Sequence, residues 1–228
     1  RPEWIPMQFV INDACWSQYP QEVLLELMAS HPSLFPGFQW PPGPVVPNYS
    51  LVARKHQPYT DDFGCVWETT EDGITGTVTR HPLAEWVHFS NDAIPDPDRC
   101  TGIGPVDWNQ LAATLSAAKA RGELTRGGLR HGHTFLQLCD LRGYQNLMYD
   151  MADERAELFT LIEQLEAFNA GIVSRYCEVG VDIMGYAEDL GMQKGPMVSP
   201  AHFRKYIKPS YERLMRPARE KGIIVHMH

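Results

Sequence analysis

The sequence predicts an α/β protein with a parallel sheet. Two apolar runs, at residues 181–187 and 222–228, have the length and composition of buried strands. Between them, Ser199 can cap a helix that has Pro200 at its first position and continues to about Lys221. A strand, a helix and a second strand in this order form a parallel pair. This alternation leaves open whether the sheet is open or closed into a barrel.

The first hundred residues predict short elements separated by loops. Residues 4–10 have the composition of a first strand, and residues 21–30 carry apolar side chains at helical spacing. Several prolines predict an ordered loop over residues 32–47, because proline ends helices and cannot donate in a sheet. Residues 59–82 predict a small hairpin with its turn at residues 71–73, and residues 92–98 a second loop.

Two further helices are predicted in the middle of the chain. Residues 108–121 have an Ala/Leu helical pattern. Residues 153–179 give the strongest prediction of a helix, because apolar side chains recur at steps of three and four. Acidic residues stand in its first turn, and Gly180 directly follows its last residue. Gly127-Gly128 and the His-Gly-His sequence at residues 131–133 lack the strand-to-helix context of a phosphate-binding loop.

Composition limits the class of partner. The chain has 228 residues, of which 43% are hydrophobic, so it can bury a large core. Its net charge of −8 argues against nucleic acid and against an anionic membrane surface, since both need a basic face. We therefore expect small molecules or proteins as partners.

The cysteines and apolar runs predict a cytoplasmic protein without a membrane span. Five scattered cysteines form no Cys-x-x-Cys pair, and no signal-peptide pattern precedes them, which fits a reducing compartment. The apolar runs are far shorter than the roughly 18 residues that a membrane helix needs. The chain begins with arginine and ends on a strand-like segment, so we expect a fragment of a longer protein.

Ionisable side chains follow both predicted strands of the last third. Glu188 and Asp189 end the first apolar run, and His226 and His228 end the second. Ligands of parallel α/β proteins gather at the carboxyl ends of strands. Adjacent residues of an extended segment point to opposite sides, so only one carboxylate can face a pocket. We favour Asp189, as a general acid or base or as an anchor for a metal-bound histidine; a capping role is the alternative.

A second pair of histidines precedes the long helix. His131 and His133 are two residues apart, so in an extended strand end they would share one side. They could form an acid/base or ligand pair, or they could be ordinary loop histidines.

Several segments together resemble the uroporphyrinogen decarboxylase-like superfamily, which also contains corrinoid- and thiol-dependent methyltransferases. They are DDFGCVW at residues 61–67, HPL at 81–83, PDP at 95–97, LRGYQNL at 141–147, DIMGYAEDLG at 182–191 and MVSPAHFRKYIKP at 197–209. The resemblance implies a TIM (β/α)8 barrel, with residues 1–228 as a single barrel domain that is truncated at its C-terminus and holds the first five or so βα units. It also implies that Asp62 lines the pocket, whereas Asp61 only caps a turn.

The two branches of this superfamily differ in their site residues. The methyltransferase branch has a His-x-Cys-Gly strand end that binds zinc; His228 looks like its histidine, and His226 is the alternative if the register slips by two. The decarboxylase branch has an Arg-Gln-Ala-Gly-Arg segment after its first strand, whose arginines hold substrate carboxylates. The corresponding residues 10–19, VINDACWSQY, contain no arginine. The resemblance therefore favours a methyltransferase.

The resemblance implies an enzyme that moves a methyl group between a small methylated donor, a corrinoid and a thiol, with zinc assistance. Its partners would be the methyl donor, a corrinoid protein and a second copy in a homodimer. Two alternatives stay open. The first is a metal-free decarboxylase of uroporphyrinogen or another carboxylic acid, and the second is a barrel that binds a corrinoid or small molecule without catalysis.

Overall fold

A computed structural model describes residues 9–90 and 93–228, which belong to two compact units. The first unit comprises Arg1–Tyr59 and Val66–Thr79, and the second comprises Thr60–Cys65 and Arg80–His228. The second unit carries the parallel sheet and every candidate site residue named above. The single barrel domain over residues 1–228 stays a prediction.

The first unit is built from short elements. They are α1 (Cys15–Gln18), α2 (Gln21–Ser30), the 3₁₀ turn η1 (Leu51–Ala53) and most residues of a sheet of order β1-β2-β3, with β1 at Tyr59–Thr60, β2 at Val66–Glu68 and β3 at Thr77–Arg80. The helix predicted at residues 21–30 and the loop at 32–47 are confirmed, and the predicted turn at 71–73 lies between β2 and β3. The strand predicted at residues 4–10 falls largely outside the described residues.

The second unit alternates helices and strands. Its elements are η2 (Trp86–His88), α3 (Trp108–Ala120), β4 (Arg126–Gly128), α4 (Phe135–Arg142), α5 (Tyr144–Ala152), α6 (Ala156–Val179), β5 (Ile183–Tyr186), β6 (Gly191–Met192), β7 (Gly195–Pro196), α7 (Pro200–His202), the π-helical segment η4 (Phe203–Ile207), α8 (Lys208–Glu220) and β8 (Ile224–Met227). The helices predicted at 108–121 and 153–179 and both strands of the last third are confirmed.

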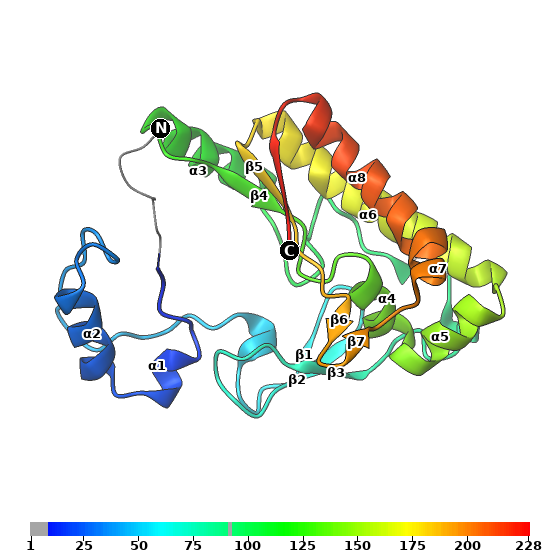
Figure 1. The fold of residues 1–228 in the computed structure, drawn as a ribbon, viewed down its shortest axis with the longest axis horizontal. Coiled ribbons are helices and arrows are strands. Elements are labelled where there is room, and N and C mark those ends of the chain that lie inside the picture. The colour runs from blue at the N-terminus through cyan, green and yellow to red at the C-terminus, as the bar shows by residue number, and fades with distance from the viewer. Residues whose placement is uncertain (1–8, 91–92) are drawn as a thin grey trace. The chain divides into compact units, whose positions relative to one another are not determined.

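The parallel sheet has the strand order β4-β5-β8. Met184 of β5 stands opposite Gly127 of β4 on one side and Val225 of β8 on the other, and both pairings are parallel. Helices α6 and α8 lie side by side and contact β4 and β8 (Figure 1). The α/β class with a parallel sheet is therefore confirmed. The sequence predicts about five βα units, whereas the parallel sheet of the described residues has three strands. These residues form no closed barrel, since a closed barrel of this kind requires about eight tilted strands.

Three elements between residues 121 and 153 escaped prediction. Strand β4 reads Arg-Gly-Gly and so carries almost no hydrophobic signal. Glycine is needed there, since a Cβ on Gly127 would lie 2.3 Å from the ring of Tyr176 in α6. The two glycines end the strand β4, and the His-Gly-His sequence lies between β4 and the helix α4. The expectation that they lack this context was wrong.

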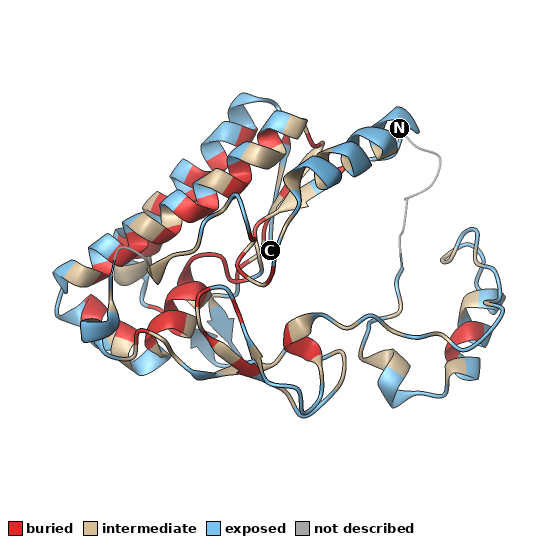
Figure 2. Cartoon of the chain, turned by 180° about the vertical axis from the view of Figure 1, so that it is seen from behind, coloured by how far each residue is buried: buried red, intermediate tan, exposed pale blue. Residues whose placement is uncertain are grey.

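The core of the second unit follows the apolar stripe of α6. Figure 2 shows buried positions recurring along the two long helices. On α6 the buried apolar residues at this spacing include Leu158, Leu161, Ile162, Leu165, Phe168 and Ile172. Phe168 packs edge-to-face on Phe63, with ring centroids 5.1 Å apart. No helix in the described ranges is long and apolar enough to span a membrane.

The helix predicted from Ser199 to about Lys221 begins and ends as expected, but it contains the π-helical segment η4. The Ser199 hydroxyl accepts the N–H of His202, and the final turn is capped at Lys221. Near the middle, the N–H of Lys208 donates to the carbonyl of Phe203, five residues back. Pro209 has no N–H to donate, so a regular α-helical turn cannot be completed at this point.

Asp182 joins the starts of β4 and β5, which predicts a pH-dependent stability. Its carboxylate accepts hydrogen bonds from the N–H and hydroxyl of Thr125, at 2.8 and 2.7 Å, and these bonds lower the pKa of Asp182. We expect Asp182→Asn to lower Tm at pH 7 by a few degrees. The Tm difference between the two proteins should shrink as the pH falls below 3.8, the ordinary pKa of an aspartate, and should disappear once the pH is below the lowered pKa of Asp182. Under those conditions the wild-type carboxylate is protonated and, like asparagine, carries no charge. Thermal unfolding at several pH values, with the exposed Asp153→Asn as control, measures this; a difference that persists at low pH would contradict it.

Candidate functional site

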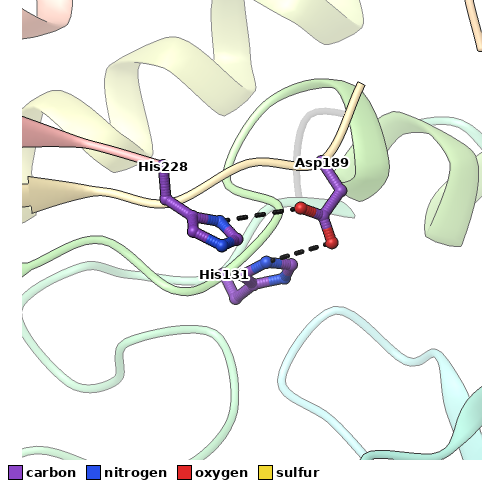
Figure 3. A group of neighbouring side chains, drawn as sticks. All are labelled: His131, Asp189 and His228. Carbon is purple, nitrogen blue, oxygen red and sulfur yellow. Dashed lines mark ion pairs between the residues drawn. The ribbon is translucent and has the colours of Figure 1, made fainter. Parts of the chain in front are cut away.

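Three polar side chains meet where the parallel strands end. His131 follows β4, Asp189 follows β5 and His228 follows β8 (Figure 3). The three strands are neighbours and run in the same direction, so their carboxyl ends share one edge of the sheet. We call these three residues the strand-end cluster.

Within the strand-end cluster the carboxylate lies between the two imidazoles. His131 Nε2 is 3.3 Å from Asp189 Oδ2, and His228 Nδ1 is 3.6 Å from Asp189 Oδ1. The imidazole rings meet edge-on, with centroids 5.6 Å apart. Each side chain is about half exposed, at 50 to 60%. The residues predicted to share a rim, Asp189 and His228, therefore do lie together, and their donor atoms are open to solvent.

Glu188 and Asp189 have opposite environments, as expected for neighbours at a strand end. Glu188 is 3% exposed, and its carboxylate accepts the N–H groups of Thr134, Phe135 and Leu136 and the hydroxyl of Tyr211, at 2.8 to 3.1 Å. These N–H groups form the N-terminus of α4, which favours an anion. Burial nevertheless raises the pKa of Glu188, because desolvation outweighs the four donors. Glu188 thus connects the end of β5 to α4 rather than facing the cluster.

His131 and His133 do not share one side, so this expectation was wrong. Residues 131–134 form a turn in which Gly132 has φ = +75°, which only glycine adopts easily. His133 is therefore turned into the core, with its ring against Tyr186 and Tyr211 and no exposed surface. Burial lowers the pKa of His133 to about 4, so its imidazole is neutral at pH 7.

His226 and Asp62 lie outside the strand-end cluster. His226 stands opposite Gly185 in the sheet and is exposed, so the structure places His228 rather than His226 beside Asp189. Asp62 is exposed and accepts the N–H of Gly104 at 2.6 Å, which ties it to a loop. Asp61 caps a turn as expected, accepting the N–H groups of residues 63 and 65.

The sequence reasoning missed the buried arginine next to the cluster. The Arg130 side chain is 6% exposed; its guanidinium lies 2.8 Å from Asp140 and 3.8 Å from Asp61, and it donates to Gln137. Its Nε also donates to the carbonyl of His131, at 3.2 Å. Arg130 thus ties the turn that carries His131 to α4. The available signal was an arginine between the Gly-Gly-Leu sequence and the His-Gly-His sequence.

The strand-end cluster has the donor set of a divalent metal site. One atom from each of the three side chains lies within 4.8 Å of the others. Catalytic zinc commonly has three protein ligands, drawn from histidine nitrogens, carboxylate oxygens and thiolates, and keeps one position open. Two imidazoles and one carboxylate therefore fit such an ion.

Comparison with known proteins connects this edge of the sheet to a family. Residues 115–228 match the family model of uroporphyrinogen decarboxylase (URO-D). This half of the chain contains the whole parallel sheet and the strand-end cluster. The chain belongs to the URO-D family. The resemblance noted from the sequence segments is thereby confirmed.

The structure of this URO-D family member is similar to that of a methyltransferase from Methanosarcina mazei. The TM-score is 0.51 at 15% sequence identity, and the match covers 100% of this chain and 65% of the methyltransferase. At this identity the similarity shows a shared fold. The chain spans about two thirds of the length of that methyltransferase. A search of curated proteins found no match.

Proposed function

We propose that this URO-D family member is a methyltransferase whose site is the strand-end cluster. The observation that carries the proposal is the meeting of His131, Asp189 and His228 at the carboxyl ends of three parallel strands. Membership of the URO-D family and the fold shared with a methyltransferase support it.

The proposed reaction moves a methyl group from a small methylated donor, by way of a corrinoid, to a thiol. In the last step the deprotonated sulfur of the thiol would form a bond to the methyl carbon, and the corrinoid, as the methyl-carrying substrate, would be the leaving group that keeps the bonding electron pair. Zinc bound near His228 would lower the pKa of the thiol and so supply the thiolate at neutral pH.

Each residue at or beside the site has a proposed role in this reaction. His228 would hold zinc, and the Asp189 carboxylate, between the two imidazoles, can accept the proton of the thiol or orient an imidazole. Glu188 and Arg130 do not face the cluster; they hold the strand end and the turn on which Asp189 and His131 stand. A corrinoid protein and a second copy of the chain remain proposed partners.

Decarboxylation is the second candidate, because the matching family model carries that name. It requires cations that hold substrate carboxylates. Arg130, adjacent to His131 in the chain, is buried and already paired with Asp140 and Asp61. Arg130 is therefore not available to hold a substrate carboxylate.

Methyl transfer can be tested with the natural protein, methylcobalamin, added zinc and a panel of small thiols. Loss of the methylcobalamin absorbance and appearance of the methyl thioether by mass spectrometry are the expected results. His228→Ala should lower the rate by about 100-fold or more, whereas the exposed His88→Ala should leave it unchanged. Carbon dioxide release from uroporphyrinogen without thiol methylation would overturn the proposal, and so would tight corrinoid binding without turnover.

A further inference from the structure

We infer that His131 and Asp189 bind zinc directly together with His228, so that two imidazoles and one carboxylate from three neighbouring strands hold the ion. The inference rests on the proposed zinc-assisted function and names the ligands of that site. It goes beyond His228 alone, and it gives Asp189 the role of a ligand rather than of an anchor behind a histidine.

The distances inside the cluster support direct binding. Ligand atoms about 2.0–2.2 Å from a tetrahedral zinc ion are separated from one another by about 3.4 Å. The two nitrogen–oxygen distances, one to each oxygen of Asp189, are 3.3 and 3.6 Å, longer than the roughly 2.7–3.2 Å of an N–H···O hydrogen bond, and one ligand atom from each residue lies within 4.8 Å of the others. The spacing thus suits an ion between the side chains better than direct contact between them.

The backbone around the cluster is held while its side chains stay free to turn. The N–H of Gly132 donates to the carbonyl of Ala187, at 2.9 Å, and so joins the end of β4 to the end of β5. Asp189 follows the buried, fully bonded Glu188. Because the ligand side chains are about half exposed, small rotations can direct one carboxylate oxygen and both nitrogens to a single ion without disturbing the core.

The total charge of the three ligands determines which kind of fourth ligand a bound zinc ion would accept. Two neutral imidazoles and one carboxylate leave a bound Zn²⁺ with a net charge of +1, which favours an anionic fourth ligand such as a thiolate. No cysteine within the described ranges joins the cluster, and burial raises the pKa of Cys65 and Cys139. In the proposed reaction, the thiol substrate would supply this thiolate.

Zinc affinity, measured on the natural protein by competition with a chelator, tests the ligand set. We expect about one zinc per chain, and an affinity lowered by about tenfold or more in each of His131→Ala, Asp189→Asn and His228→Ala. His226→Ala is the matched control, since it removes an exposed histidine two residues from His228 on the same strand and should keep wild-type affinity. Equal Tm values of the zinc-free proteins would show that all of them fold.

The outcomes separate this inference from the proposed function. Wild-type zinc affinity in both His131→Ala and Asp189→Asn would overturn the inference, even if methyl transfer proceeds. Loss of zinc in these two variants, from a protein that methylates no thiol, would support the inference and overturn the proposed function. A wild-type protein that binds no zinc would overturn the inference.

Discussion

Replacing Glu188 with alanine is expected to destabilise the protein by about 3–5 kcal/mol, which corresponds to a fall in Tm of about 10 °C. The substitution removes the acceptor of three backbone N–H groups at the start of α4 and of the Tyr211 hydroxyl. Glu188 is 3% exposed, so water cannot replace the lost carboxylate without a rearrangement. Thermal unfolding monitored by circular dichroism measures the effect.

Two further variants test whether the loss of stability comes from the hydrogen bonds of Glu188. Glu188→Gln keeps an acceptor oxygen and the size of the side chain, and should lose less stability than Glu188→Ala. Glu178→Ala removes an exposed carboxylate of α6 and should change stability by less than about 0.5 kcal/mol. If Glu188→Ala behaved like Glu178→Ala, the assignment of Glu188 as the anion of the α4 N-terminus would be wrong.

Replacing Arg130 with methionine is expected to cost about 3–5 kcal/mol as well, because it leaves buried carboxylates without their cation. Asp140 lies 2.8 Å and Asp61 3.8 Å from the guanidinium, and all three side chains are buried or nearly so. Burial already raises the pKa of Asp140 although Arg130 opposes the shift, so removal of Arg130 should raise this pKa further. Unfolding in urea at pH 7 measures the loss.

A second substitution tests the origin of the Arg130 effect. Asp140→Asn in the Arg130→Met background should recover part of the stability, since it removes the buried Asp140 charge that Arg130 no longer balances. Arg175→Met is the control; it breaks an exposed ion pair with Asp98 and should cost less than about 1 kcal/mol. Equal losses in Arg130→Met and Arg175→Met would refute a buried charge cluster.

The elements predicted correctly are those whose sequences carry a local signal. Helix α6 has an unbroken apolar stripe and ends at Gly180, which has φ = +75°. Ser199 and Pro200 mark the start of the next helix, and the apolar runs mark β5 and β8. Strand β4 has no such signal, because it reads Arg-Gly-Gly and its Gly127 is required by close packing with Tyr176 of α6 rather than by strand propensity.

Part of the strand-end cluster was predicted from the sequence, because strand order is also a signal that can be read along the chain. Strand order along the chain was enough to bring Asp189 and His228 to one edge, since parallel strands end on the same side. The choice of His131 over His133 depended on a turn at Gly132, and that turn follows β4, a strand that the sequence did not reveal. The Arg130 cluster was missed because Asp61 and Asp140 are far apart in the chain.

By itself, the sequence determined the α/β class, the helices and strands with strong periodicity, the family resemblance, and the strand ends that carry Asp189 and His228. Only the tertiary structure decided that Glu188 is buried on α4, that His133 lies in the core, and that His131 completes the strand-end cluster. The physical reason is that periodicity records which face of an element is buried. The direction of a side chain beyond a strand end depends on turn geometry and on partners that are distant in the chain.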